Sequence, residues 1–114
     1  MKKLFSRLLS RLGRRRGAGP VTFRLTHVPA NTPAGATIYL ASSRNGWTTD
    51  DPAYAFSFDP GTSSYTLTLA PGRGTLNYKI CRGSWPTIET DADNLAIPNR
   101  RYLFGLAPRE VPLQ

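Results

Sequence analysis

The fold class is decided by one stretch of the chain, YTLTLAPGRGTLNYKI at residues 65–80. Its two halves, 65–69 and 76–80, carry an apolar side chain at every second position, which is the period of a β-strand with one buried face. Between them stands PGRG, where proline and glycine favour a turn. We expect two strands joined by a hairpin turn at Pro71-Gly72. Alternation along the second strand places Leu76, Tyr78 and Ile80 in a core and Asn77, Lys79 and Cys81 on the other face.

Similar stretches recur on both sides of this pair at intervals of roughly 8–12 residues. They lie at 21–26, 37–41, 54–58 and 101–104, and segments rich in Gly, Pro, Asn and Asp separate them. Asp59-Pro60-Gly61 predicts a second hairpin, with glycine in a positive-φ position. This spacing predicts an all-β protein, an immunoglobulin-like antiparallel β-sandwich of six to eight short strands.

Composition supports this fold class and excludes several kinds of site. The 114 residues include 10 Gly and 10 Pro, too many turn-formers for a helical bundle. With one cysteine, Cys81, and one histidine, His27, the chain has neither a disulfide framework nor the ligands of a zinc site. We expect Cys81 to be a small filler on the outer or edge side, His27 to be a surface residue, and the chain to use no metal or cofactor.

Charge divides the chain into a basic leader and a nearly neutral domain. Residues 1–20 hold seven basic and no acidic groups, whereas residues 21–114 hold eight basic and seven acidic groups. We expect a leader at 1–20, a domain at 21–106 and a C-terminal tail at 107–114. The excess positive charge belongs to the leader, so it does not indicate a specific nucleic acid as the partner of the domain.

The leader has the periodicity of a short amphipathic helix. Leu4, Phe5, Leu8, Leu9 and Leu12 fall within an arc of about 140°. Two interpretations stay open: a helix that binds an anionic membrane surface, or a disordered tail that docks on a partner or on nothing. Arg7 and Arg11 interrupt the apolar run that a secretion signal needs. We therefore expect a cytoplasmic protein, with the inner membrane surface as a candidate contact of the leader.

Two tryptophans stand outside the strand pattern. Trp47 follows Asn45-Gly46, and Trp85 follows Gly83-Ser84, so both are expected in turn-rich loops. A loop tryptophan either caps the core or presents its ring face to a ligand. Two of them, with an outward Lys79 on a nearby strand, favour a binding platform.

The tryptophans belong to a set of sequence fragments that resembles a known family. The fragments TIYLA (37–41), NGW (45–47), YTLTLAPG (65–72), NYKI (77–80), RGSW (82–85) and IPNR (97–100) occur in an order and spacing that resemble a starch-binding domain. The family is carbohydrate-binding module family 20, with the family 48 glycogen-binding modules close to it. The resemblance covers residues 21–106.

The resemblance implies a function and a set of site residues. It implies a noncatalytic module that binds α-1,4-glucan, such as starch, glycogen or a maltooligosaccharide, and works with a glucan-active enzyme. The sugar-binding residues would be Trp47, Lys79, Trp85 and Asn99. Two acidic residues, Glu89 and Asp91, are candidate acceptors at the rim.

An enzyme remains the rival class. Glycoside hydrolysis needs two carboxylates across a cleft. The acidic residues Asp50, Asp51, Glu89, Asp91 and Asp93 fall in predicted loops, and no catalytic triad or phosphate loop is present. We expect no catalytic residue. Three hypotheses stay open: the glucan-binding module, an immunoglobulin-like protein-interaction or regulatory module, and, least favoured, a hydrolase.

Overall fold

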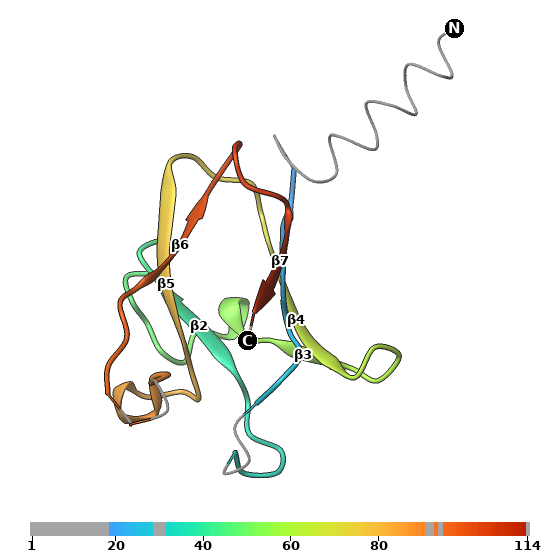
Figure 1. Ribbon diagram of the computed structural model, residues 1–114, viewed down its shortest axis with the longest axis vertical. Coiled ribbons are helices and arrows are strands. Elements are labelled where there is room, and N and C mark those ends of the chain that lie inside the picture. Colours follow the sequence, from blue (N-terminus) through green and yellow to red (C-terminus); the bar gives the residue numbers. More distant parts are fainter. Residues whose placement is uncertain (1–18, 29–31, 91–92, 94, 114) are drawn as a thin grey trace, which may run out of the picture.

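The structure is a computed structural model that describes residues 19–28, 32–90, 93 and 95–113 (Figure 1). The predicted leader lies outside the described residues, except for Gly19 and Pro20. Seven strands and two short 3-10 helices make up the regular structure of the described residues. They are β1 (Val21–Leu25), β2 (Tyr39–Ser42), η1 (Pro52–Tyr54), β3 (Ser57–Asp59), β4 (Ser64–Leu69), β5 (Thr75–Cys81), η2 (Trp85–Thr87), β6 (Arg100–Leu103) and β7 (Glu110–Leu113).

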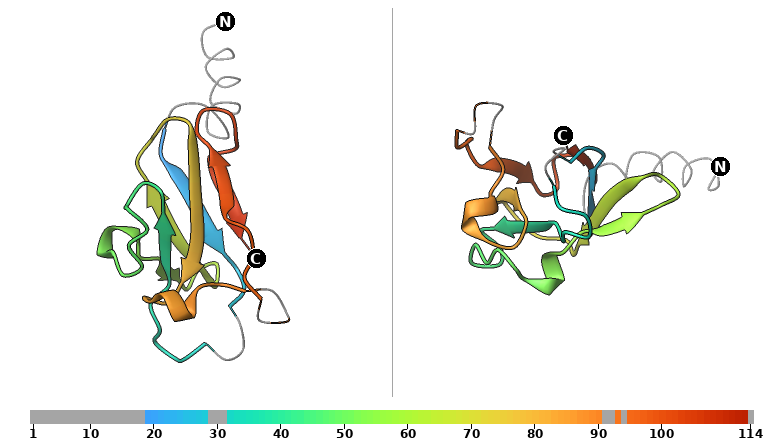
Figure 2. Two further views of the ribbon diagram at one scale, coloured as in Figure 1. Left: turned by 90° about the vertical axis from the view of Figure 1, so that its left-hand side faces the viewer. Right: turned by 90° about the horizontal axis from the view of Figure 1, so that it is seen from below.

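The strands form two sheets, which confirms the all-β sandwich. One sheet has the order β3-β4-β1-β7 and the other β2-β5-β6. In the left view of Figure 2, the three-stranded sheet lies in front of β1 and β4. Four of the five strand pairs are antiparallel, but β1 and β7 pair in parallel, from Thr22 opposite Glu110 to Leu25 opposite Leu113. The sandwich is therefore antiparallel, as expected, except at this edge, where β7 runs parallel to β1.

The core lies between the sheets and is centred on an aromatic cluster. Phe23 of β1 is fully buried and packs edge-on against Tyr78 of β5 at 5.1 Å and Tyr102 of β6 at 5.9 Å between ring centroids. Leu76, Tyr78 and Ile80 are all buried, as their alternation predicted. The opposite face of β5 is therefore available to carry the candidate site.

Strand β7 corrects the predicted domain boundary. Residues 107–114 were expected to be a tail, yet Glu110–Leu113 forms the edge of the larger sheet and Leu113 is 2% exposed. This strand is hard to recognise in the sequence because it contains Pro112, and proline is normally excluded from strands except at sheet edges. The domain extends through Leu113.

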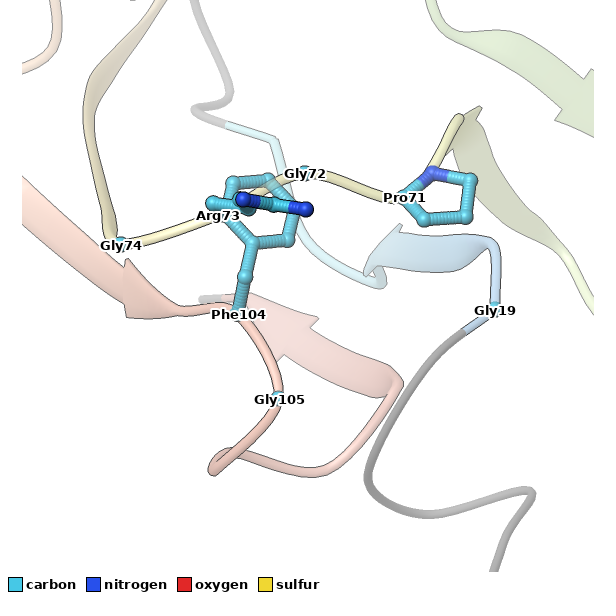
Figure 3. Close-up of a pocket in the computed structure, with 7 residues that line it drawn as sticks. All are labelled: Gly19, Pro71, Gly72, Arg73, Gly74, Phe104 and Gly105. Carbon is cyan, nitrogen blue, oxygen red and sulfur yellow. The ribbon is translucent and has the colours of Figure 1, made fainter.

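The PGRG segment is a crossover and not a hairpin. It connects β4 in one sheet to β5 in the other, so the predicted turn at Pro71-Gly72 was wrong. Figure 3 shows the Phe104 ring beneath this backbone. A Cβ atom on Gly72 would lie 2.9 Å from that ring, and the positive φ belongs to Gly74. Glycine is thus needed at 72 for close approach and at 74 for backbone conformation.

The other predicted turn does form a hairpin. Residues 60–63 connect β3 to β4, which are antiparallel, and the Asp59 carboxylate accepts a hydrogen bond from the Gly61 amide at 3.0 Å. The positive φ falls on Ser63 and not on Gly61.

The predicted strand 54–58 is shorter than expected, since Asp51 caps a 3-10 turn over 52–54. No helix in the described ranges is long and apolar enough to cross a membrane.

Candidate functional site

Trp47 sits in a tight turn that leaves the end of β2. The Ser42 carbonyl accepts hydrogen bonds from the amides of Asn45 (3.2 Å) and Trp47 (2.8 Å). Gly46 and Trp47 both have positive φ, 64° and 60°. This region is open to glycine but costs roughly 1–2 kcal/mol for a residue with a Cβ. The turn therefore holds Trp47 in a backbone conformation that a free chain would avoid, which is common at functional sites.

Asn45 organises this turn from within. Its Oδ1 accepts the Ser42 amide at 2.9 Å, and its Nδ2 donates to the Thr48 carbonyl at 3.3 Å and to Asp51 Oδ2 at 3.4 Å. The sequence analysis quoted Asn45 as part of a motif and assigned it no role. Its position before Gly46 was the available signal, because asparagine side chains commonly bond to nearby backbone groups in turns.

Trp85 sits at the start of η2 in a loop built around Thr87. Thr87 Oγ1 accepts hydrogen bonds from the amides of Arg82 (2.9 Å) and Ser84 (3.2 Å) and donates to the Ser84 carbonyl at 2.7 Å. Pro86 restricts the backbone at the next position. The Trp85 side chain is 55% exposed, so the loop is ordered by its own hydrogen bonds and not by burial of the indole.

Direct contacts join the two tryptophan loops. Thr49 Oγ1 donates to the Gly83 carbonyl at 3.3 Å, and Cys81 Sγ donates to the Thr49 carbonyl at 3.3 Å. Cys81 is therefore buried beneath the 43–51 loop, which corrects its predicted place on an outer or edge side. Burial raises the pKa of the Cys81 thiol, so it is less reactive than a free thiol. His27 is exposed, as predicted.

The loops bring the two indole rings together. The ring centroids of Trp47 and Trp85 are 6.5 Å apart, and the ring planes are inclined by 34°. Trp85 is more than half exposed and Trp47 is half-buried. The two indoles are therefore neighbours, held by loops whose backbones are ordered by hydrogen bonds.

The two polar candidates lie on neighbouring segments of the smaller sheet. Lys79 faces outward from β5, opposite Ala41 of β2, and its Nζ donates to the Ile97 carbonyl at 2.6 Å. An ammonium group has three donors, so two remain for a ligand. Asn99 is exposed just before β6, two residues from Ile97. A hydrogen bond thus connects Lys79 to the segment that contains Asn99. Neither the Lys79 nor the Asn99 side chain is hydrogen-bonded to Trp47 or Trp85.

Glu89 is occupied by contacts within the protein. Its carboxylate accepts hydrogen bonds from Arg100 Nε (2.9 Å to Oε1) and Nη2 (2.9 Å to Oε2) and from the Ile80 amide at 3.1 Å. The side chain is 16% exposed. The hydrogen bonds to Glu89 raise the pKa of Arg100. This arrangement does not favour Glu89 as the predicted rim acceptor. The other rim candidate, Asp91, lies outside the described residues.

Asp51 is likewise engaged in a contact within the protein. The Asp51 carboxylate caps η1 by accepting the Ala53 amide at 3.0 Å. Within the described part of the chain, no three His, Cys, Asp or Glu side chains are grouped so that they could hold a metal ion. The chemistry that this surface offers is ring packing and hydrogen bonding.

A separate pocket of about 310 Å³ opens at the other end of β5 (Figure 3). It is lined by Gly19, Pro71, Gly72, Arg73, Gly74, Phe104 and Gly105. Neither tryptophan borders it.

Comparison with known proteins relates most of the domain to an amylase. A segment of 84 residues, 73% of this chain, is 45% identical to part of an alpha-amylase from Niallia circulans. The matched segment is 6% of that amylase, so the chain corresponds to a small part of a much larger protein. No protein-family model matches the chain, and its membership of family 20 therefore stays a prediction.

Proposed function

We propose that this domain is a noncatalytic module that binds α-1,4-glucan on the Trp47–Trp85 platform. The observation that carries the proposal is the pair of indole rings, 6.5 Å apart and inclined by 34°, with Trp85 55% exposed. The likeness to a small part of an alpha-amylase supports it, because the resemblance to family 20 implies a module that works with a glucan-active enzyme.

Ring chemistry favours a sugar on this platform. One face of a glucose ring exposes C–H groups that carry partial positive charge, and these pack on the negative face of an indole. An α-1,4-linked chain curves, so successive glucose rings are inclined to one another. Two inclined indoles suit such a chain better than the flat surface of cellulose.

Hydrogen bonds would fix the orientation of the chain on the rings. The free donors of Lys79 and the exposed amide of Asn99 suit the neighbouring O2 and O3 hydroxyl groups of adjacent glucoses. Each of these bonds replaces one to water, so the net gain is small and the site is shallow. We expect dissociation constants of roughly micromolar to millimolar.

Affinity electrophoresis in gels with and without soluble starch tests the proposal. Starch should retard the wild-type chain, and Trp47→Ala or Trp85→Ala should abolish the retardation without unfolding the protein. Phe58→Ala is the matched control, because Phe58 is also an aromatic residue that is 55% exposed but lies on β3 in the other sheet. Equal mobility of the wild type in both gels would refute glucan binding.

The same experiment separates the rival classes. Loss of retardation in Phe58→Ala but not in the tryptophan variants would place the sugar on the other sheet. Release of reducing sugar from starch by the purified chain would favour the hydrolase. Absence of both retardation and hydrolysis would leave the protein-interaction module.

A further inference from the structure

We infer that Glu89 and Arg100 are positioning residues for Trp85, which deepens the function proposed above and rests on it. Together they anchor the loop of residues 82–88 to the smaller sheet and so set where the Trp85 ring stands relative to Trp47. Neither residue needs to touch the sugar to have this effect.

The first support is the way Glu89 closes the loop. Its amide donates to the Ile80 carbonyl at 2.9 Å, and its carboxylate accepts the Ile80 amide at 3.1 Å. Glu89 thereby continues the hydrogen bonding of β5 and returns the chain to the strand on which the loop began. The loop is closed over nine residues at one point, and Trp85 lies near its middle.

The second support is the geometry of the ion pair. Arg100 approaches Glu89 with Nε at 2.9 Å and 3.1 Å from the two carboxylate oxygens and with Nη2 at 2.9 Å. A fork of this kind fixes orientation as well as distance. Arg100 is the first residue of β6, which pairs with β5. The pair therefore connects the end of the loop to a second strand of the same sheet.

The third support is burial. The side chains of Arg100 and Glu89 are 28% and 16% exposed, so solvent screens them less than a surface pair. Removing one partner takes this two-point contact from the other, partly buried charge, and such a change costs more than the pair itself contributes. The loop end would then move, and the Trp85 ring would move with it.

The test uses the full chain and two measurements. The first is circular dichroism without sugar: two indoles this close couple their ultraviolet transitions and produce a paired band of opposite signs, which Trp85→Phe should remove. The second is maltoheptaose affinity by isothermal titration. Glu89→Ala and Arg100→Gln should weaken the paired band and reduce the affinity about tenfold. Glu89→Gln keeps an acceptor for the Ile80 amide and should lie between these variants and the wild type.

Two controls make the result specific. Glu110→Gln and Arg73→Gln remove the same charges at exposed positions away from the loop and should leave both measurements unchanged. If Glu89→Ala does not fold, Arg100→Gln decides the matter, because it leaves the Glu89–Ile80 hydrogen bonds in place.

The outcomes distinguish this inference from the proposed function. An unchanged paired band in Arg100→Gln and Glu89→Gln would overturn the inference, whether affinity falls or not, since a fall without ring movement would indicate direct contact with sugar. A wild type that shows the band but binds no maltoheptaose would refute glucan binding, while the band in the variants would still report the position of Trp85.

Discussion

Asn45→Ala is the sharpest perturbation of the Trp47 turn. The substitution removes five side-chain hydrogen bonds. One, from the Ser42 amide, has a good length (2.9 Å), and four are longer: those with Ser42 Oγ (3.4 Å), the Leu40 carbonyl (3.5 Å), the Thr48 carbonyl (3.3 Å) and Asp51 Oδ2 (3.4 Å). At about 1 kcal/mol for the first and about a quarter of that for each of the four longer ones, three of which share the two Nδ2 protons, the loss is about 2 kcal/mol. For a domain of this size, such a loss lowers Tm by about 10 °C.

The same variant should weaken glucan binding more than its stability loss explains. Without the Asn45 side chain, fewer contacts offset the cost of the left-handed conformation of Trp47, whose φ is 60°. The turn should relax in the folded protein and carry the indole away from Trp85. We expect a loss of affinity of about tenfold, measured by titration with maltoheptaose well below the Tm of the variant.

Asn77→Ala is the control for this prediction. Asn77 is half-buried on the outer face of β5, and its side chain forms no hydrogen bond with the described residues. Its substitution should leave both Tm and affinity near those of the wild type. The reasoning would be refuted by an Asn45→Ala protein with an unchanged Tm, or by one with a lowered Tm and wild-type affinity.

Three further predictions concern the fold that supports the site. Leu113→Ala should lower the free energy of unfolding by about 2–5 kcal/mol in urea titrations, because Leu113 is 2% exposed. A negligible change would show that β7 contributes nothing to the stability of the domain. Gly72→Ala should cost about 1–3 kcal/mol, because its Cβ would lie 2.9 Å from the Phe104 ring, and Phe104→Leu in the same chain should recover part of the loss; no recovery would contradict the clash. Burial raises the pKa of Tyr78 to about 12, so the folded protein keeps the phenol proton where the unfolded chain loses it. Stability should therefore fall by about 2–3 kcal/mol as pH rises from 10 toward 12, and less in Tyr78→Phe; equal alkaline loss in both proteins would contradict this cause.

Local pattern was enough to predict the strands of the core. Leu76, Tyr78 and Ile80 alternate with polar neighbours, and the structure buries all three. The period of two is a property of the strand itself, so it is visible without knowledge of any partner. The same pattern could not show that β4 and β5 belong to different sheets, because a turn sequence such as PGRG also suits a crossover.

The sequence also predicted only some features of the candidate site. Residue type and position in a loop marked Trp47 and Trp85 as candidates, and strand phase placed Lys79 on the outer face. Glu89 shows the limit of this reasoning. Its carboxylate could bind a ligand or another part of the protein. Only the positions of the Ile80 amide and of Arg100, eleven residues away, show that the protein occupies it.

The amino-acid sequence alone determined the all-β class, the buried face of each main strand and the loops that hold the tryptophans, since periodicity and turn chemistry depend on neighbouring residues. Tertiary structure alone decided the parallel place of β7, the burial of Cys81 beneath Thr49 and the separation of 6.5 Å between the indoles. Each of these depends on contacts between segments far apart in the chain. Such contacts form only when packing of the two sheets repays the entropy of ordering the loops between them.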